Sequence, residues 1–357
     1  MKRLLSFTGV VIAAGVFWAC TSDVPGPTPS SVSTPTASVS PDSTSTPTPF
    51  PTSTLAPVRR WVRLPLNEGV VTAVAVNPTA DQLLYAGANS GALYGSEDGG
   101  KTWTALPLEG VTSAITTISL GASHPGLIVV GTAGSGAYMS ADRGVSWASV
   151  GNGLQGRHVF ALIIAPGDDG GMYAGTDAGL FRSLNGETWD VLPTRFSPPA
   201  VQAVLVDDAN PAELYSGTSV GIYKSVDAGQ SWQITSNGLT DNHVLTMAKD
   251  PANPSTIWAG TEIAGLYKST DGGRLWRRSS SGLVGTYVGV MLADMRGKTL
   301  YAATGTGVFK TTDAFSWDAE GTDLTNKNVT SLAISATGER RLYAATFGGG
   351  LFRLVID

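Results

Sequence analysis

The stretch LYSGTSVGIYKSVDAGQSW, residues 214–232, places two short β-type segments around a glycine turn and ends in an acidic turn followed by tryptophan. Tyr, Ile, Val and Thr favour extended backbone, whereas Gly, Ser and Asp favour turns. The same pattern recurs every 42 to 44 residues along the chain. The position of Tyr215 is equivalent, across the copies, to Tyr85, Val129, Tyr173, Trp258, Tyr301 and Tyr343.

An alternating or apolar segment such as VFALIIAP, residues 159–166, precedes each copy, and a turn and a further strand follow each of the first six. Four short strands in such a period are typical of one blade of a β-propeller. The seven copies account for nearly all of residues 61–357. The sequence therefore predicts an all-β fold, a single seven-bladed β-propeller of four-stranded antiparallel blades.

The segment WVRLPL, residues 61–66, has the tryptophan of a fourth strand but no acidic turn before it. The last copy, in contrast, reaches Asp357 directly after its third strand. We predict that the N-terminal strand 61–66 completes the last blade and closes the ring, which removes the open junction between the first and last blades. Trp61 would then occupy the place that Trp103 has in its own blade.

The first 57 residues have a different composition from the repeats. Lys2 and Arg3 precede a short apolar run that ends at Cys20, and Ser, Thr and Pro supply 27 of the 37 residues from 21 to 57. The run is typical of an export signal, and Cys20 in this position resembles a bacterial lipoprotein box. The alternative is an ordinary or uncleaved secretory leader. Residues 21–57 cannot bury enough apolar surface to fold, so they predict an extended stalk.

We therefore expect three parts: a lipoprotein-type signal peptide at 1–20, a disordered stalk at 21–57 and a propeller at 58–357. This organisation predicts an exported protein that is lipid-anchored to the cell membrane, with its domain extracellular or periplasmic. The net charge of −5 argues against nucleic acid as a partner, because such binding needs a basic surface. The single cysteine excludes a disulfide framework and a multi-cysteine zinc site. We expect a monomer without metal or cofactor.

Acidic turns of the pattern Ser-x-Asp-x-Gly-x-x-Trp separate the third and fourth segments of four copies, and two further copies have shorter versions. In such a turn the carboxylate can accept main-chain N–H groups, and glycine supplies a positive φ. One active site does not need several copies around a ring, so we interpret these side chains as structural. They are Asp98, Asp142, Asp227, Asp271, Asp313 and, in place of an aspartate, Asn185.

The acidic turns resemble the Asp-box, or bacterial neuraminidase repeat, and the resemblance covers residues 61–357. That superfamily includes sialidases, xyloglucanases, sortilin-type receptors and photosystem II assembly factors. The resemblance implies that the acidic turns lie on the face opposite the binding site. The Arg-Ile-Pro string of a sialidase does not occur in this sequence, and neither does an obvious equivalent of the arginine patch of the assembly factors.

The connections between copies also repeat, and they predict a site. The residue directly before each first segment should lie near the mouth of the central channel. It is polar in four copies, at His158, His243, Tyr287 and Asn328, and apolar in three, at Val70, Ala114 and Ala200. Arg157, Asp241 and Arg195 flank this polar arc. We predict a shallow ligand-binding site here, and the alternative is that these are ordinary loop residues.

The predicted function is a non-catalytic, surface-tethered binding or scaffold propeller that recognises a protein or a glycan, including an assembly or stability factor for a membrane complex. The alternative is a glycoside hydrolase, sialidase-like or xyloglucanase-like, that acts on extracellular polysaccharide. Hydrolysis of a glycosidic bond needs two carboxylates about 5–10 Å apart. The acidic residues expected on the same face come from different copies and predict no catalytic pair: Glu68, Glu109, Asp177, Asp241, Glu262 and Asp323.

Overall fold

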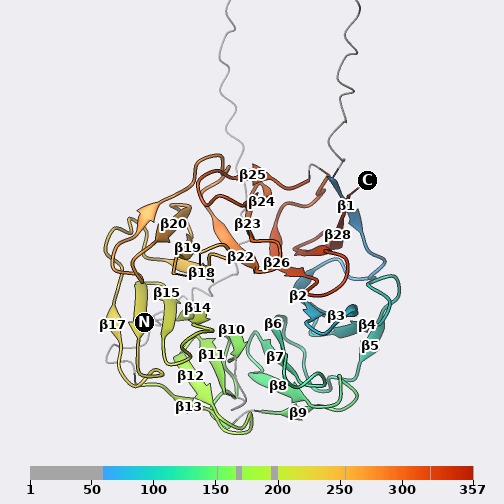
Figure 1. Cartoon of the computed structure of the whole chain (residues 1–357). Coiled ribbons are helices and arrows are strands. Elements are labelled where there is room, and N and C mark those ends of the chain that lie inside the picture. The colour runs from blue at the N-terminus through green and yellow to red at the C-terminus, as the bar shows by residue number, and fades with distance from the viewer. Residues whose placement is uncertain are drawn as a thin grey trace, which may run out of the picture. The chain divides into compact units, whose positions relative to one another are not determined.

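The structure is a computed structural model that describes residues 59–356 except 151, 166–170, 194–199, 254 and 322. The described residues form seven four-stranded antiparallel sheets around one axis, and Figure 1 looks along that axis. The predicted fold class is thereby confirmed. None of the described residues belongs to a helix that could span a membrane. The predictions for 1–57, Cys20 included, and for Arg195 lie outside the described residues.

Six blades take their strands in chain order from the innermost to the outermost. The first three are β2 (Val71–Asn77), β3 (Ala80–Ala88), β4 (Leu93–Ser96) and β5 (Thr104–Leu106); β6 (Ile115–Leu120), β7 (Ile128–Thr132), β8 (Ala137–Ser140) and β9 (Ala148–Ser149); and β10 (Val159–Ile164), β11 (Met172–Thr176), β12 (Gly179–Ser183) and β13 (Asp190–Val191).

The next three are β14 (Val201–Val206), β15 (Leu214–Thr218), β16 (Gly221–Ser225) and β17 (Gln233–Ile234); β18 (Val244–Lys249), β19 (Ile257–Thr261), β20 (Leu266–Ser269) and β21 (Arg277–Arg278); and β22 (Val288–Asp294), β23 (Thr299–Thr304), β24 (Gly307–Thr311) and β25 (Asp318–Ala319). The seventh blade has the order β26 (Val329–Ile334), β27 (Leu342–Thr346), β28 (Gly350–Ile356) and β1 (Arg59–Arg63).

The N-terminal strand β1 closes the ring, as predicted, by pairing antiparallel with β28. Trp61 lies opposite Leu354 in this ladder. The predicted bounds of 61–66 were wrong, since the strand begins at Arg59 and ends at Arg63. It starts earlier because β28 extends far enough to pair with Arg59, and Pro65, which has no N–H to donate, stands two residues beyond its end.

Two buried contacts hold β1 against the preceding blade. The indole N–H of Trp61 donates to the main-chain oxygen of Glu320 at 2.8 Å. Trp276 makes the equivalent bond to its own preceding blade, so Trp61 does take the place of a blade tryptophan. The Glu320 carboxylate is fully buried and pairs with Arg59 of β1 and with Lys310 of β24, the latter at 2.8 Å. Loss of either cation, Arg59 or Lys310, would leave the negative charge of the buried Glu320 carboxylate less well compensated.

Glycine on the second strand lets adjacent blades pack closely, which explains its repetition in the sequence. A Cβ at Gly175 would lie 2.6 Å from the main-chain oxygen of Val201, the first residue of the next innermost strand. Gly260 approaches the main-chain oxygen of Val288 in the same way, at 2.7 Å, and a Cβ at Gly87, Gly131 or Gly217 would lie within 2.8 Å of side-chain atoms of the next blade. The innermost strands thus stand side by side around the channel, where Figure 1 shows β2, β6, β10, β14, β18, β22 and β26.

The two ends of the channel carry different loops. Because neighbouring strands are antiparallel, the first and third strands of a blade run in the same direction. The acidic turns follow the third strands, so they lie on the face where the innermost strands end; we call it the acidic-turn face. Connections between blades, such as residues 235–243, lie where the innermost strands begin; we call it the inter-blade face.

Candidate functional site

The innermost strand of every blade has a β-bulge at its second residue. Bulges redirect a side chain and recur beside functional sites. The bulged residues are Thr72, Thr116, Phe160, Gln202, Leu245, Gly289 and Thr330. Three of them are threonines whose hydroxyls donate to the main-chain oxygen of the first residue of the next blade, at 2.5 to 2.7 Å. These hydroxyls join consecutive blades, whereas three of the other four bulges, at Phe160, Leu245 and Gly289, lie on blades of the predicted polar arc.

His243 is the centre of a hydrogen-bonded cluster at this mouth of the channel. Its Nδ1 lies 2.6 Å from Glu262 Oε2, and its Nε2 lies 2.8 Å from the side-chain nitrogen of Gln202 in the preceding blade. A carboxylate only accepts, so Nδ1 carries a proton, and in the neutral ring Nε2 accepts from the Gln202 amide. Both side chains of the His243–Glu262 pair remain partly exposed, at 29% and 42%.

Tyr287 lies beside this cluster on the next blade. Burial raises the pKa of the Tyr287 phenol, and the nearby charge of Glu262 raises it further. The Tyr287 ring covers the bulge at Gly289, where a Cβ would lie 2.5 Å from the phenol oxygen. Glycine at this bulge therefore makes the room that the ring occupies. The structure thus brings His243 and Tyr287 into one group with Glu262 and Gln202.

Asp241 supports the cluster through its carboxylate, which accepts hydrogen bonds from the main chain of two loops. Its two carboxylate oxygens accept hydrogen bonds from the main-chain N–H groups of His243, at 2.9 Å, and Ile263, at 2.8 Å. The side chain is 9% exposed, so it is committed to holding the two loops together. Through these bonds Asp241 sets the relative position of His243 and Glu262, the residue before Ile263. We interpret it as a positioning residue.

The remaining predicted residues lie apart from this group. His158 stacks on Phe160, with ring centroids 4.2 Å apart, and burial lowers its pKa while the charge of Asp177 opposes that shift. Arg157 is exposed and Asn328 is half-buried. Among the residues that the structure describes, no hydrogen bond or ring contact links these three to His243. Arg195, as noted, is not described.

Sequence reasoning placed Glu262 on this face without including it in the site, and it missed Gln202. A signal for Gln202 exists in the alignment of the copies. Three copies have threonine at the second residue of the innermost strand. Gln202 takes the same position in its own copy, and its longer side chain can reach the following blade. Glu262 sits in the second-to-third-strand turn, whose contact with the loop before β18 appears only once the blade is folded.

The acidic turns use their polar groups internally. In each of the four full copies the serine hydroxyl donates to the aspartate and accepts the glycine N–H, at 2.7 to 2.9 Å. The pKa of Asp142 is lowered to about 2, chiefly by the hydrogen bond from the Ser146 hydroxyl. The hydrogen bond from the Ser231 hydroxyl is likewise the main cause that lowers the pKa of Asp227 to about 2. The glycines adopt φ near 90°. These carboxylates are bonded within their own turns.

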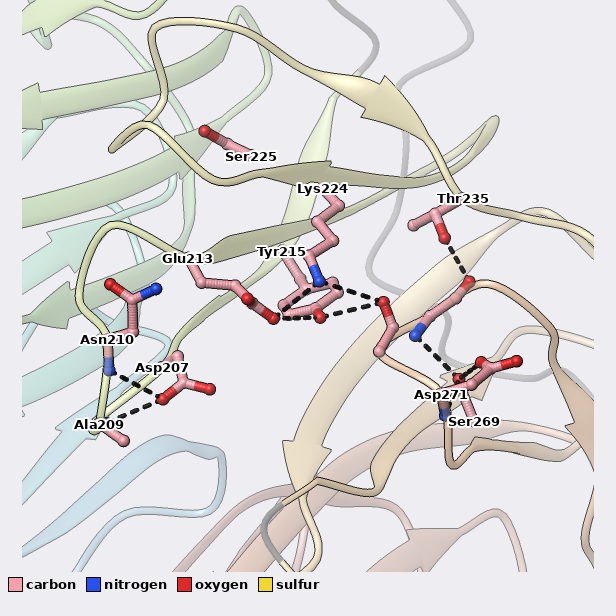
Figure 2. A network of polar contacts seen from close by, with 12 residues as sticks. Asp207, Ala209, Asn210, Glu213, Tyr215, Lys224, Ser225, Thr235, Ser269 and Asp271 are labelled. Carbon is pink, nitrogen blue, oxygen red and sulfur yellow. Dashed lines mark hydrogen bonds and ion pairs between the residues drawn. The ribbon is translucent and has the colours of Figure 1, made fainter.

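A further polar network joins two blades on the acidic-turn face, and Figure 2 shows it. The ammonium of Lys224 pairs with Glu213 at 2.8 Å and lies 5.0 Å from the centre of the Tyr215 ring. The Tyr215 hydroxyl donates to Glu213 at 2.6 Å and lies 3.1 Å from the main-chain oxygen of Gly272 in the next blade. Burial and the charge of Glu213 raise the pKa of Tyr215, so it stays a donor. This network fastens the blades together.

Metal binding has no candidate group in residues 59–356, leaving aside the short stretches that the structure does not describe. No three His, Cys, Asp or Glu side chains among them gather closely enough to hold an ion. The His243 cluster instead places one hydrogen-bonded pair of titratable side chains, His243 and Glu262, at the inter-blade mouth. Its chemistry is that of hydrogen bonding to a ligand: one imidazole, one carboxylate, one amide and one phenol.

Comparison with known proteins supports the fold. No protein-family model matches the sequence, and no curated protein matches it significantly. Among solved structures, the chain is similar to the GH74 xyloglucanase from Xanthomonas campestris, with TM-score 0.67 and 20% identity over 83% of this chain. The chain spans about half of that enzyme, 53% of its length.

Two other structures have similar scores. YCF48 bound to D1 peptide gives TM-score 0.61 at 15% identity, covering 84% of this chain and 97% of that chain. The extracellular domain of the one-component system BT4673 from B. thetaiotaomicron gives TM-score 0.64 at 15% identity, covering 83% and 39%. These likenesses show that the chain has a seven-bladed propeller fold shared by enzymes and by binding proteins.

Proposed function

We propose that this chain is a non-catalytic binding or scaffold propeller that recognises a protein or a glycan at the inter-blade mouth of its channel. The observation that carries the proposal is the His243 cluster, in which Gln202, Glu262 and Tyr287 converge from three blades. Gln202 Oε1 is buried and accepts no hydrogen bond from the described residues, and buried acceptors favour a donor partner. An exposed face with such convergent polar groups and an aromatic ring suits ligand recognition.

The likeness to YCF48 bound to D1 peptide supports a protein ligand, and a role in assembly or stability of a membrane complex is part of this proposal. The internal bonding of the acidic turns supports membership of the Asp-box superfamily, which we propose on that ground. For residues 1–57 we propose export, lipidation at Cys20 and a stalk that holds the propeller outside the membrane. Detergent phase partitioning of the full chain and of Cys20→Ala tests the anchor, because only the lipidated form should enter the detergent phase.

A glycan array and a pull-down with the full chain would identify ligands for the site. The double variant His243→Ala, Tyr287→Ala should then lose about tenfold or more in affinity, since two hydrogen-bonding groups are removed. Its unfolding midpoint should remain close to that of the parent. Lys327→Ala, on the exposed connection that leads into the seventh blade, is the matched control and should bind normally. Unchanged affinity in the double variant would reject the site.

A glycoside hydrolase is the second candidate, because the fold is similar to that of a GH74 xyloglucanase and the partly exposed Glu262 carboxylate lies at the inter-blade mouth. Glu262 bonds the His243 ring, and Asp241 bonds its main-chain N–H. The test is release of reducing sugar from xyloglucan and of sialic acid from sialyllactose by the full chain. Activity that disappears in Glu262→Gln would establish hydrolysis and replace the binding proposal. Activity equal in parent and variant would assign the catalysis elsewhere.

A further inference from the structure

A hollow of about 460 Å³ opens on the acidic-turn face, where five innermost strands end. Its walls come from β6, β10, β14, β18 and β22, the strands around the channel in Figure 1. The apolar lining of these walls includes Leu120, Ile164, Leu205, Met247, Met291 and Met295. Since the innermost strands begin at one face and end at the other, this hollow and the His243 cluster lie at opposite mouths of the channel.

The walls of the hollow suit a bulky apolar group. Its volume falls within the range of about 300–1,000 Å³ that is usual for ligand pockets. Met295 is 52% exposed, so part of this apolar wall faces solvent. Methionine is flexible and polarisable, so a wall with three methionines can adapt to side chains of different shape.

The rim of the hollow carries an uncompensated negative charge. Lys249 at the end of β18 lies 2.8 Å from Asp207, so these two groups neutralise each other. Asp207 is further occupied by the main-chain N–H groups of Ala209 and Asn210. Asp208 lines the hollow, is exposed, and forms no hydrogen bond or ion pair with the described residues. Its carboxylate is therefore available to a cation from outside.

We propose that this hollow seats a bulky apolar side chain of a partner polypeptide that has lysine or arginine as the adjacent residue. The apolar walls take the side chain, and Asp208 pairs with the neighbouring cation. The chain's net charge of −5 further favours a basic partner. The proposal adds a second binding site to the one at the inter-blade mouth and stands independently of it.

The test uses the methyl NMR signals of the full chain labelled at its six methionines. Three of them line the hollow, whereas Met139 and Met172 pack near Gly186 and serve as internal references. The probe is acetyl-Gly-Gly-Trp-Lys-Gly-Gly-amide. Titration should move the signals of the three hollow methionines and leave both references in place. The peptide with Glu in place of Lys, and the peptide with Ser in place of Trp, should each bind more weakly.

Two variants make the assignment specific. Asp208→Asn should weaken the Trp-Lys peptide about two- to fivefold, the effect of losing one exposed ion pair. Asp190→Asn, which changes another exposed carboxylate, on β13, is the matched control and should change nothing. Met295→Lys puts a cation into an exposed part of the wall and should abolish the shifts while the chain stays folded.

Three outcomes would overturn the proposal. The first is no movement of the Met247, Met291 and Met295 signals at millimolar peptide. The second is equal binding of the Trp-Lys and Trp-Glu peptides, or no effect of Asp208→Asn. The third is movement of these signals with protein concentration alone, which would make a second copy of the chain the occupant.

Discussion

Replacing Trp61 with alanine should test whether β1 closes the ring. Trp61 is 5% exposed, packs in the core between the last blade and the preceding one, and donates a buried hydrogen bond to the main-chain oxygen of Glu320 at 2.8 Å. Truncation of a buried tryptophan costs about 3–5 kcal/mol in the free energy of unfolding. For a domain of this size that corresponds to a fall in thermal midpoint on the order of 10 °C. Urea unfolding followed by far-UV circular dichroism measures the loss.

Trp276→Ala is the appropriate comparison because Trp276 is 1% exposed, belongs to a blade of continuous chain and makes the equivalent bond to the preceding blade. The two variants should lose similar stability, since pairing with β28 makes β1 a full member of its blade. Trp61→Phe should lose about 1 kcal/mol, the usual net contribution of one hydrogen bond. The reasoning is refuted if Trp61→Ala costs under about 1 kcal/mol while Trp276→Ala costs several.

Three further outcomes follow from close contacts and from the acidic turns. Gly175→Ala should destabilise by about 1–3 kcal/mol in urea unfolding, because the new methyl meets main chain of the next blade at 2.6 Å; a neutral result would contradict the packing. The pKa values of Asp142 and Asp227 are lowered from 3.8 to about 2, so their stabilisation is complete above pH 3.8 and is lost as the pH falls through about 2. The double asparagine variant should therefore show a thermal midpoint that falls less between pH 4 and pH 2, and an unchanged slope would contradict this. Gly289→Ala should displace the Tyr287 ring and reduce binding of an identified ligand as much as Tyr287→Ala does; intact binding would exclude the ring from the site.

The repeats predicted the fold because each copy encodes the same local structure. Alternating apolar residues form strands, and glycine and aspartate form the turns between them, so the number of blades could be counted from Tyr85 to Tyr343. The ring closure was also predictable, because WVRLPL is a fourth strand without a third one before it. The bounds of that strand were predicted wrongly: it begins at Arg59, because β28 is long enough to pair with that residue, and it ends at Arg63, two residues before Pro65.

The candidate site was predicted in part. His243 and Tyr287 were found because the residue before each innermost strand is equivalent from copy to copy. The convergence of Gln202, Glu262 and His243 involves three segments and two blades, and the methionine-lined hollow takes its walls from five blades. Local sequence sets strands and turns because these depend on contacts between near neighbours. Only the packed ring decides which side chains meet across a seam or around the channel, since those distances depend on the rotation of one blade against the next.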